Sequence, residues 1–278
     1  MTRAARSDKI QKNAASRGGK ERILADILFL GTCAADFSPR LLTDCRDRFD
    51  DDARRASCAL VNGRYLIDCG PHCPDSLRIA GIDPGCITDI FLTHLHADHF
   101  VKESVEYVAS SHPVRLWVRS DATLPQIGNV EVMRMDSFER YGAGEDFFVT
   151  GLPANHDPGA FPQHLLIEAD GKKIFYGMDG GWLLNKTYAR LWNTHLDLCV
   201  LDGTCGDYEG DYRMGEHNSI PMIRLMLPSL RTVGAIDGHT LIFISHLAPS
   251  LHKPHAETVR ICEKDGIHVA SDGLRLSL

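Results

Sequence analysis

One short segment, THLHADH at residues 93–99, places three imidazoles and a carboxylate directly after the apolar segment DIFL. His94 and His96 alternate along the chain, so in an extended conformation both project to the same side and can reach one ion. Asp98 and His99 follow where a helix is expected to begin, and turn toward an adjacent position. Imidazoles and carboxylates are ligands of Zn, Mn and Fe(II). The segment therefore predicts a metal site at the end of a strand.

These ligands must be positioned by strands and helices. Apolar runs separated by Gly, Asp and Pro recur from residue 27 onward, which is the pattern expected of such elements. Two-residue turn signals at Asn62-Gly63 and Asp170-Gly171 each predict a hairpin. Strands are predicted at about 26–31, 57–62, 64–68, 88–92, 114–118, 130–134, 146–151, 163–169, 172–177, 197–202, 240–245 and 267–270. Helices are predicted at roughly 101–110, 182–191, 219–230 and 254–264, the third bracketed by Pro221 and Pro228.

The order of these elements predicts the fold class. Paired strands come first in each half of the chain, followed by alternating strands and helices. This order indicates an α/β (α+β) domain of two mixed sheets packed together with helices outside. We expect residues 23–278 to form this single domain and residues 1–22 to be a basic, disordered tail. Residues 36–56, which contain six Asp, are predicted to be a long solvated loop.

Composition limits the functional classes. The chain has 278 residues, of which 44% are hydrophobic and 24% charged, so it can bury a sizeable core and is neither disordered nor a coiled coil. No apolar run approaches the length of a membrane span. Residues 1–22 lack the apolar stretch of a secretory signal, and the nine cysteines lack CxxC pairs, so we expect a cytoplasmic protein with reduced thiols.

Charge is unevenly distributed along the chain. Residues 1–22 carry seven Lys and Arg against two acidic residues, a net charge of +5. The whole chain has a formal net charge of −7, so residues 23–278 carry −12. A body this acidic disfavours nucleic acid as a partner.

The pattern HxHxDH at residues 94–99 resembles the signature of the metallo-β-lactamase superfamily. The resemblance covers the chain from about residue 26 onward and implies a four-layer αββα sandwich with a dinuclear metal site. It also implies further ligands in NHD at 155–157, in GMDGG at 177–181 and after LIFIS at 241–245. In this interpretation one ion is held by His94, His96 and His156, and the other by Asp98, His99 and His246. Asp179 is shared, and Asp68 in LIDCG orients a ligand histidine.

Within the superfamily the chain is most similar to the phosphoribosyl cyclic phosphodiesterase branch, whose relatives are the tRNA 3′-end processing endonucleases. The supporting stretches are GT at 31–32, LD at 201–202, GEHN at 215–218, SHLAPSLHKPHAE from residue 245 and the closing SDGLRLSL. In that branch a histidine at the position of His217 acts near the substrate. Many members also carry a CxCxxC-type zinc loop after the first strand. Here that region offers only Cys33 and Cys45, so no structural zinc is predicted.

Two divalent ions, Zn or Mn with Fe as a third candidate, would activate a water as metal-bound hydroxide and polarise a phosphoryl oxygen. Asp98 is expected to hold the metal and orient the nucleophile, as is Asp179. His217 is expected to donate a proton to the leaving oxygen. Candidate substrate contacts are His252, His255 and Tyr208, for each of which a surface or core role is the alternative.

The leading functional hypothesis is a phosphodiesterase that acts on a small or cyclic phosphate ester. A carboxylic ester, lactone or thioester hydrolase using the same metals is the main alternative. A tRNA-processing endonuclease is less favoured, because the chain has no Gly/Pro-rich basic arm. A β-lactamase is disfavoured by Asp179, where such enzymes usually carry Cys. Flavodiiron oxidoreduction and a non-catalytic metal-binding role are also disfavoured. A homodimer is the expectation at the family level.

Overall fold

The computed structural model describes residues 25–278, so the basic tail predicted at residues 1–22 lies outside the described residues. The first sheet has the strand order β14-β1-β2-β3-β4-β5-β6. Its strands are β1 (Asp26–Gly31), β2 (Cys58–Val61), β3 (Tyr65–Ile67), β4 (Asp89–Phe91), β5 (Val114–Arg119), β6 (Val130–Met135) and β14 (Arg275–Ser277). The sheet is antiparallel from β14 to β3 and parallel from β3 to β6.

The second sheet repeats this arrangement, with the order β13-β12-β11-β10-β9-β8-β7. Its strands are β7 (Arg140–Gly144), β8 (Phe147–Pro153), β9 (Gln163–Ala169), β10 (Lys172–Gly177), β11 (Leu198–Asp202), β12 (Leu241–Ser245) and β13 (Ile267–Val269). It is antiparallel from β7 to β10 and parallel from β10 to β13. Each half of the chain therefore contributes one mixed sheet, as the order of elements predicted, except that β14 from the C-terminal end joins the first sheet.

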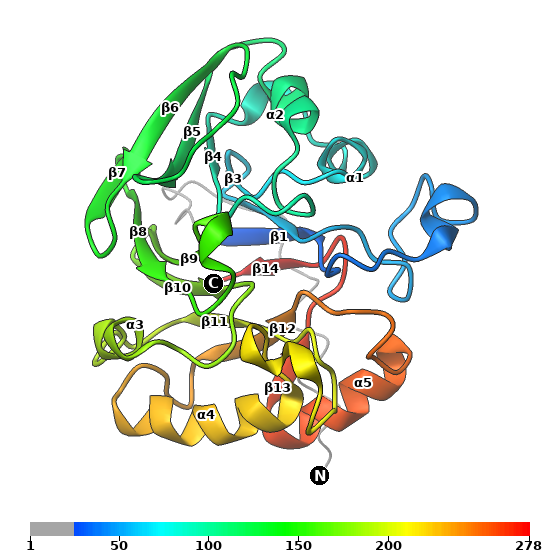
Figure 1. Ribbon diagram of the computed structural model, residues 1–278, viewed down its shortest axis with the longest axis vertical. Helices are drawn as coiled ribbons and strands as arrows, with labels where there is room; N and C mark the ends of the chain where they lie inside the picture. Colours follow the sequence, from blue (N-terminus) through cyan, green and yellow to red (C-terminus); the bar gives the residue numbers. More distant parts are fainter. Residues whose placement is uncertain (1–24) are drawn as a thin grey trace, which may run out of the picture.

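Helices cover the outer faces of both sheets (Figure 1). The first sheet carries α1 (Cys73–Ala80) and α2 (Lys102–Val108); the second carries α3 (Asn185–Arg190), α4 (Ile220–Thr232) and α5 (His255–Cys262). Between the sheets lies an apolar cluster that includes Phe29, Ile67 and Tyr176. Separate clusters join each sheet to its helices, through Leu77 on one side and Ile223 on the other. The predicted four-layer αββα sandwich is confirmed.

Local sequence explains most of these elements. The hairpin turn at Asn62-Gly63 has positive φ at both residues, as has the turn at Asp170-Gly171. The helix α4 begins after Ser219, whose side chain accepts a hydrogen bond from the N–H of Met222. Three elements were not predicted: α1, β7 and β14. The helix α4 contains Pro228 near its end, as predicted, and reaches Thr232, two residues beyond the predicted end.

The segment at residues 36–56 differs in part from the solvated loop that the sequence predicted. It folds around Arg55, which is 2% exposed. The Arg55 guanidinium donates hydrogen bonds to the carbonyl oxygens of Cys45, Arg46 and Arg48. Buried donors require acceptors, and the loop supplies them from its own backbone. Throughout residues 25–278, the helices are too short or too polar to cross a membrane.

Candidate metal centre

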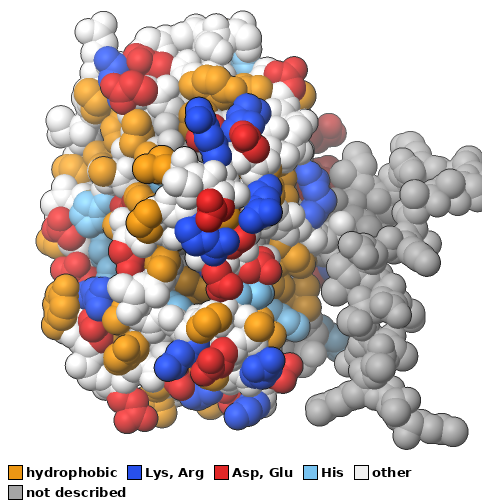
Figure 2. Space-filling model, turned by 90° about the vertical axis from the view of Figure 1, so that its right-hand side faces the viewer, with side chains coloured by type: hydrophobic (Ala, Val, Ile, Leu, Met, Phe, Trp, Pro, Cys, Tyr) orange, Lys and Arg blue, Asp and Glu red, His pale blue; other side chains and the backbone are white. Residues whose placement is uncertain are grey.

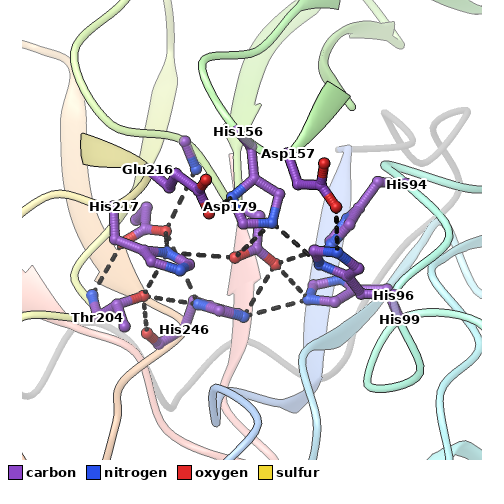
Figure 3. A network of polar contacts seen from close by, with 12 residues as sticks. His94, His96, His99, His156, Asp157, Asp179, Thr204, Glu216, His217 and His246 are labelled. Atoms are coloured by element: carbon purple, nitrogen blue, oxygen red, sulfur yellow. Dashed lines mark hydrogen bonds and ion pairs between the residues drawn. The ribbon is translucent and has the colours of Figure 1, made fainter. Parts of the chain in front are cut away.

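Every side chain predicted to bind metal follows the C-terminal end of a strand, and both sheets contribute. His94, His96, Asp98 and His99 follow β4, His156 follows β8, Asp179 follows β10 and His246 follows β12. Figure 3 shows these side chains, apart from Asp98, converging from separate elements. Loops at one edge of a rigid framework are the usual place for a site.

Backbone conformation at the strand ends turns these side chains inward. Asp68, Asp179 and His246 have φ of 61°, 45° and 60°, in the left-handed region that non-glycine residues rarely adopt. Such positions cost about 1–3 kcal/mol each and cluster at functional sites. Gly70 allows the loop after β3 to pack closely against the segment at Asp98, because a Cβ at this position would lie 1.8 Å from the carbonyl oxygen of Asp98. Only glycine lets the two segments approach this closely.

The first ligand group consists of His94, His96 and His156, whose nearest ligand atoms all lie within 4.8 Å of one another. His156 Nε2 is 3.0 Å from His96 Nδ1. The other ring nitrogen of His96, Nε2, lies 3.4 Å from Asp157 Oδ2. His94 and His156 are buried, whereas His96 is partly exposed. These are the three histidines that the resemblance assigned to one ion.

The second ligand group consists of Asp98, His99, Asp179 and His246, all buried and again within 4.8 Å of one another. Asp179 Oδ2 lies 2.5 Å from His99 Nε2 and 3.0 Å from His246 Nε2. The two imidazole Nε2 atoms are 3.1 Å apart. Asp98 Oδ2 lies 3.5 Å from His246 Nε2. This set matches the residues expected around the other ion.

Asp179 contacts both groups. Its carboxylate also lies 3.4 Å from His94 Nε2 and 4.0 Å from His156 Nε2. A single carboxylate between two sets of imidazoles occupies the position that a shared ligand needs.

The donor chemistry of the site fits divalent cations. His94 Nε2 and Asp179 Oδ2 are buried and make no hydrogen bond within the described residues. Imidazole nitrogens face each other in the pairs His96–His156 and His99–His246. Unsatisfied buried acceptors that point at a common centre require an explanation, and a bound cation supplies one. Five imidazoles and two carboxylates suit Zn, Mn or Fe.

Burial and neighbouring charge favour the ligand forms of several groups. Burial lowers the pKa of His94 well below its usual value, and the neighbouring His99 adds to this effect. Burial alone would raise the pKa of Asp98, but His99 and His246 hold it far below its usual value. The pKa of Asp179 is likewise well below its usual value because three imidazoles outweigh burial. Neutral imidazoles and ionised carboxylates are the forms that bind metal.

Two hydrogen-bonded side chains orient the ligand histidines from behind. Asp68 Oδ2 lies 2.8 Å from His99 Nδ1, while its Oδ1 accepts hydrogen bonds from the N–H and the hydroxyl of Thr93. The Thr204 hydroxyl lies 2.7 Å from His246 Nδ1. Both contacts leave Nε2 facing the centre. This arrangement fixes the tautomer and ring orientation of metal-binding histidines.

His217 lies next to the second group. Its Nδ1 is 2.9 Å from Asp202 Oδ2 and 3.3 Å from Asp179 Oδ1. Burial would lower the pKa of His217, but Asp202 raises it above the usual value. The ring therefore tends to hold a proton. The ligand atoms of Asp179, Asp202, His217 and His246 also form a third compact group.

The sequence did not assign roles to several residues of the site. Asp157, Thr204, Asp202, Glu216 and Arg213 all lie at the centre. Asp157 and Glu216 are each adjacent in sequence to a predicted site histidine, and this adjacency is the signal that could have identified them. Glu216 Oε2 lies 3.7 Å from His156 Nδ1.

A cavity of about 250 Å³ opens onto the centre. It is lined by Ala34, Ala35, Asp36, His96, Asp98, His156, Asp179, Thr204, Arg213, Glu216, His217, His246 and Ala248. The cavity is small, and both ligand groups reach its wall, although His94 and His99 do not line it.

The structure does not bring the three candidate substrate contacts to this cavity. His252 and His255 line a neighbouring cavity with Leu247 and Pro249. Tyr208 lines another, together with His252. Ala248 faces the metal centre, whereas the residues on either side of it face the neighbouring cavity. His252 Nε2 instead lies 2.7 Å from the carbonyl oxygen of Gly203, and His255 Nδ1 lies 2.7 Å from the Arg54 guanidinium.

Comparison with known proteins supports the resemblance to the metallo-β-lactamase superfamily. The family model described as "Metallo-beta-lactamase superfamily" matches residues 51–176. Zinc phosphodiesterase ELAC protein 1 of Mus musculus is 37% identical over 78 residues, which is 27% of this chain and 18% of that protein. The human protein of the same name matches equally. The chain thus aligns with less than a fifth of the length of these relatives.

Solved structures share the fold over most of the chain. A diphosphatase from the PhnP family has a TM-score of 0.66 at 20% identity, with 91% of this chain and 98% of that chain covered. Zn(2+)-bound PqqB from Methylobacterium extorquens has a TM-score of 0.67 at 17% identity, with 91% and 100% covered. The short form of human tRNase Z has a TM-score of 0.62 at 20% identity, with 91% and 98% covered. The chain has the metallo-β-lactamase fold.

Proposed function

We propose that this chain is a metal-dependent phosphodiesterase that acts on small or cyclic phosphate esters with about two divalent ions, Zn or Mn. The observation that carries the proposal is the convergence of two ligand groups, buried apart from His96, on the carboxylate of Asp179. Ions held there would polarise a phosphoryl oxygen and lower the pKa of water. The similarity to a zinc phosphodiesterase and the shared fold with a diphosphatase support this choice of substrate.

Asp98 and His217 are the proposed catalytic residues, and both line the cavity. Asp98 is kept anionic by the neighbouring imidazoles, so it can accept a hydrogen bond from the attacking water and orient it. His217 is bound to Asp202 through Nδ1, which leaves Nε2 to deliver a proton to the leaving oxygen. General acid catalysis of this kind contributes about 10²–10⁴-fold.

The size and charge of the site support a small substrate. The cavity of about 250 Å³ suits a small ester better than a polymer. On the face drawn in Figure 2, basic and acidic side chains are interspersed, as expected for a protein whose ligand is not a long polyanion.

The test is a comparison of substrates on metal-loaded protein. We expect about two ions per chain and faster hydrolysis of bis(p-nitrophenyl) phosphate than of lactones, p-nitrophenyl acetate or β-lactams. Hydrolysis of carboxylic esters or lactones alone would support the alternative, an ester hydrolase that uses the same ligands. Protein that binds no divalent metal would contradict both.

A further inference from the structure

Arg213 lines the metal cavity without belonging to either ligand group. It is the one Lys or Arg among the described residues that line this cavity. The other ionisable side chains outside the ligand groups are the carboxylates of Asp36 and Glu216 and the imidazole of His217. An anionic substrate that enters therefore meets two carboxylates and a single permanent positive charge supplied by the chain.

The guanidinium of Arg213 is fixed on two sides. Its Nε and Nη2 donate to the two carboxylate oxygens of Asp211, at 2.7 and 2.9 Å. This contact lowers the pKa of Asp211 to about 2. The guanidinium carbon lies 5.2 Å from the centre of the Tyr212 ring. The remaining nitrogen, Nη1, makes no hydrogen bond within residues 25–278 and is the one left for a ligand.

The turn that carries Arg213 is tied to the metal centre. The carbonyl oxygen of Arg213 accepts hydrogen bonds from the N–H groups of Glu216 and His217, both at 2.9 Å. The Asn155 side chain donates to the carbonyl oxygen of Gly215 at 3.3 Å. Figure 3 shows Glu216 and His217, from the end of this turn, directed toward His156 and Asp179. Arg213 and the proposed proton donor are thus held on one turn.

We infer that Arg213 binds a non-bridging phosphoryl oxygen of the substrate and makes the site select phosphate esters over neutral carboxylic esters. This inference rests on the proposed function. A phosphodiester has two non-bridging oxygens that share a negative charge, whereas a carboxylic ester has one uncharged carbonyl oxygen. Charge-assisted hydrogen bonds from arginine to phosphate are about twice as strong as neutral ones. The nearby carboxylates make that positive charge more important, because they repel the same anion.

The inference is tested with R213Q in metal-loaded protein, with inorganic phosphate as the binding probe. Calorimetry should show phosphate binding weakened about 10-fold or more. The kcat/KM for bis(p-nitrophenyl) phosphate should fall about 100-fold, the effect of losing one donor to a developing charge. Any hydrolysis of p-nitrophenyl acetate should change much less, because that ester carries no negative charge for Arg213 to bind, and metal content should be unchanged.

Two further variants separate the role of Arg213 from a general loss of charge or structure. D211N removes the anion that holds the guanidinium, so it should weaken phosphate binding less than R213Q does. R231Q removes one positive charge from the exposed end of α4 and should leave phosphate binding and turnover unchanged.

The two proposals fail in different ways. Phosphate binding that is the same in R213Q and in the original protein overturns the inference about Arg213. An equal loss of activity on the phosphate and carboxylic esters also overturns it. Original protein that binds phosphate through Arg213 but cleaves no phosphodiester overturns the proposed function instead.

Discussion

Asp68 offers a sharp test of how the metal centre is built, through the substitution D68N. Its carboxylate is fully buried and accepts from Thr93 N and the Thr93 hydroxyl, while also contacting His99 Nδ1. An asparagine has one acceptor oxygen. If that oxygen keeps the Thr93 contacts, the amide NH₂ faces His99 Nδ1. His99 must then carry its proton on Nε2, the nitrogen directed at Asp179, and can no longer donate that lone pair to a metal.

The expected magnitude follows from this change of tautomer. Loss of a carboxylate behind a ligand histidine typically costs 10–100-fold in metal affinity, which is about 1.4–2.7 kcal/mol. Competition with a chromophoric chelator measures the Zn affinity of each variant. Folding should also weaken, by about 2 kcal/mol for a hydrogen bond to a buried charge.

D272N is the matched control for D68N. Asp272 is also buried and accepts from a backbone N–H, that of Arg55, and from a threonine hydroxyl, that of Thr32. Neither of these hydrogen bonds involves a proposed metal ligand. D272N should therefore lower the Tm as D68N does and leave Zn affinity unchanged. Equal Zn affinity in D68N and the original protein would refute the proposed role of Asp68.

Three further predictions concern the shared carboxylate, the proton donor and a buried imidazole. D179A should deplete the bound metal and reduce phosphodiester hydrolysis by about 10³-fold or more; unchanged turnover would exclude the shared role. H217A should lower turnover by about 10²–10⁴-fold with metal retained; loss of metal would make His217 a ligand. Burial lowers the pKa of His252 to about 4, against about 6.5 in the unfolded chain. Its contribution to stability is present above pH about 6.5 and is lost as pH falls to about 4, by up to about 3 kcal/mol. Urea unfolding should show a shallower pH dependence in H252Q over this range, and an identical slope would contradict the assignment.

The sequence predicted four of the proposed ligands because their signals are local. THLHADH at residues 93–99 combines a strand end, alternating imidazoles and a carboxylate within one short segment. His156, Asp179 and His246 have no such local pattern. They were found through the resemblance, which gave the order of strand ends at which ligands occur. The structure places all of them around the first segment.

Other features depend on contacts between distant segments, which the sequence does not display. Thr204 orients His246 across 42 residues of chain. Arg213 lines the cavity from a turn that is hydrogen-bonded to Asn155 through Gly215, 60 residues away in the chain. His252 and His255 follow His246 closely, yet a turn begins at Ala248, and both histidines line a different cavity. The strand β7 contains Gly142 and Gly144, and β14 has three residues, so neither gave a strand pattern.

We propose that this fold holds metal in two ligand groups and uses it to hydrolyse phosphodiesters. The most direct measurement is the rate of bis(p-nitrophenyl) phosphate hydrolysis as Zn or Mn is titrated into protein stripped by a chelator. We expect no activity in the stripped protein and a rate that rises to a plateau at about two equivalents per chain. Hydrolysis that is independent of added metal, or no hydrolysis at any metal concentration, would contradict it.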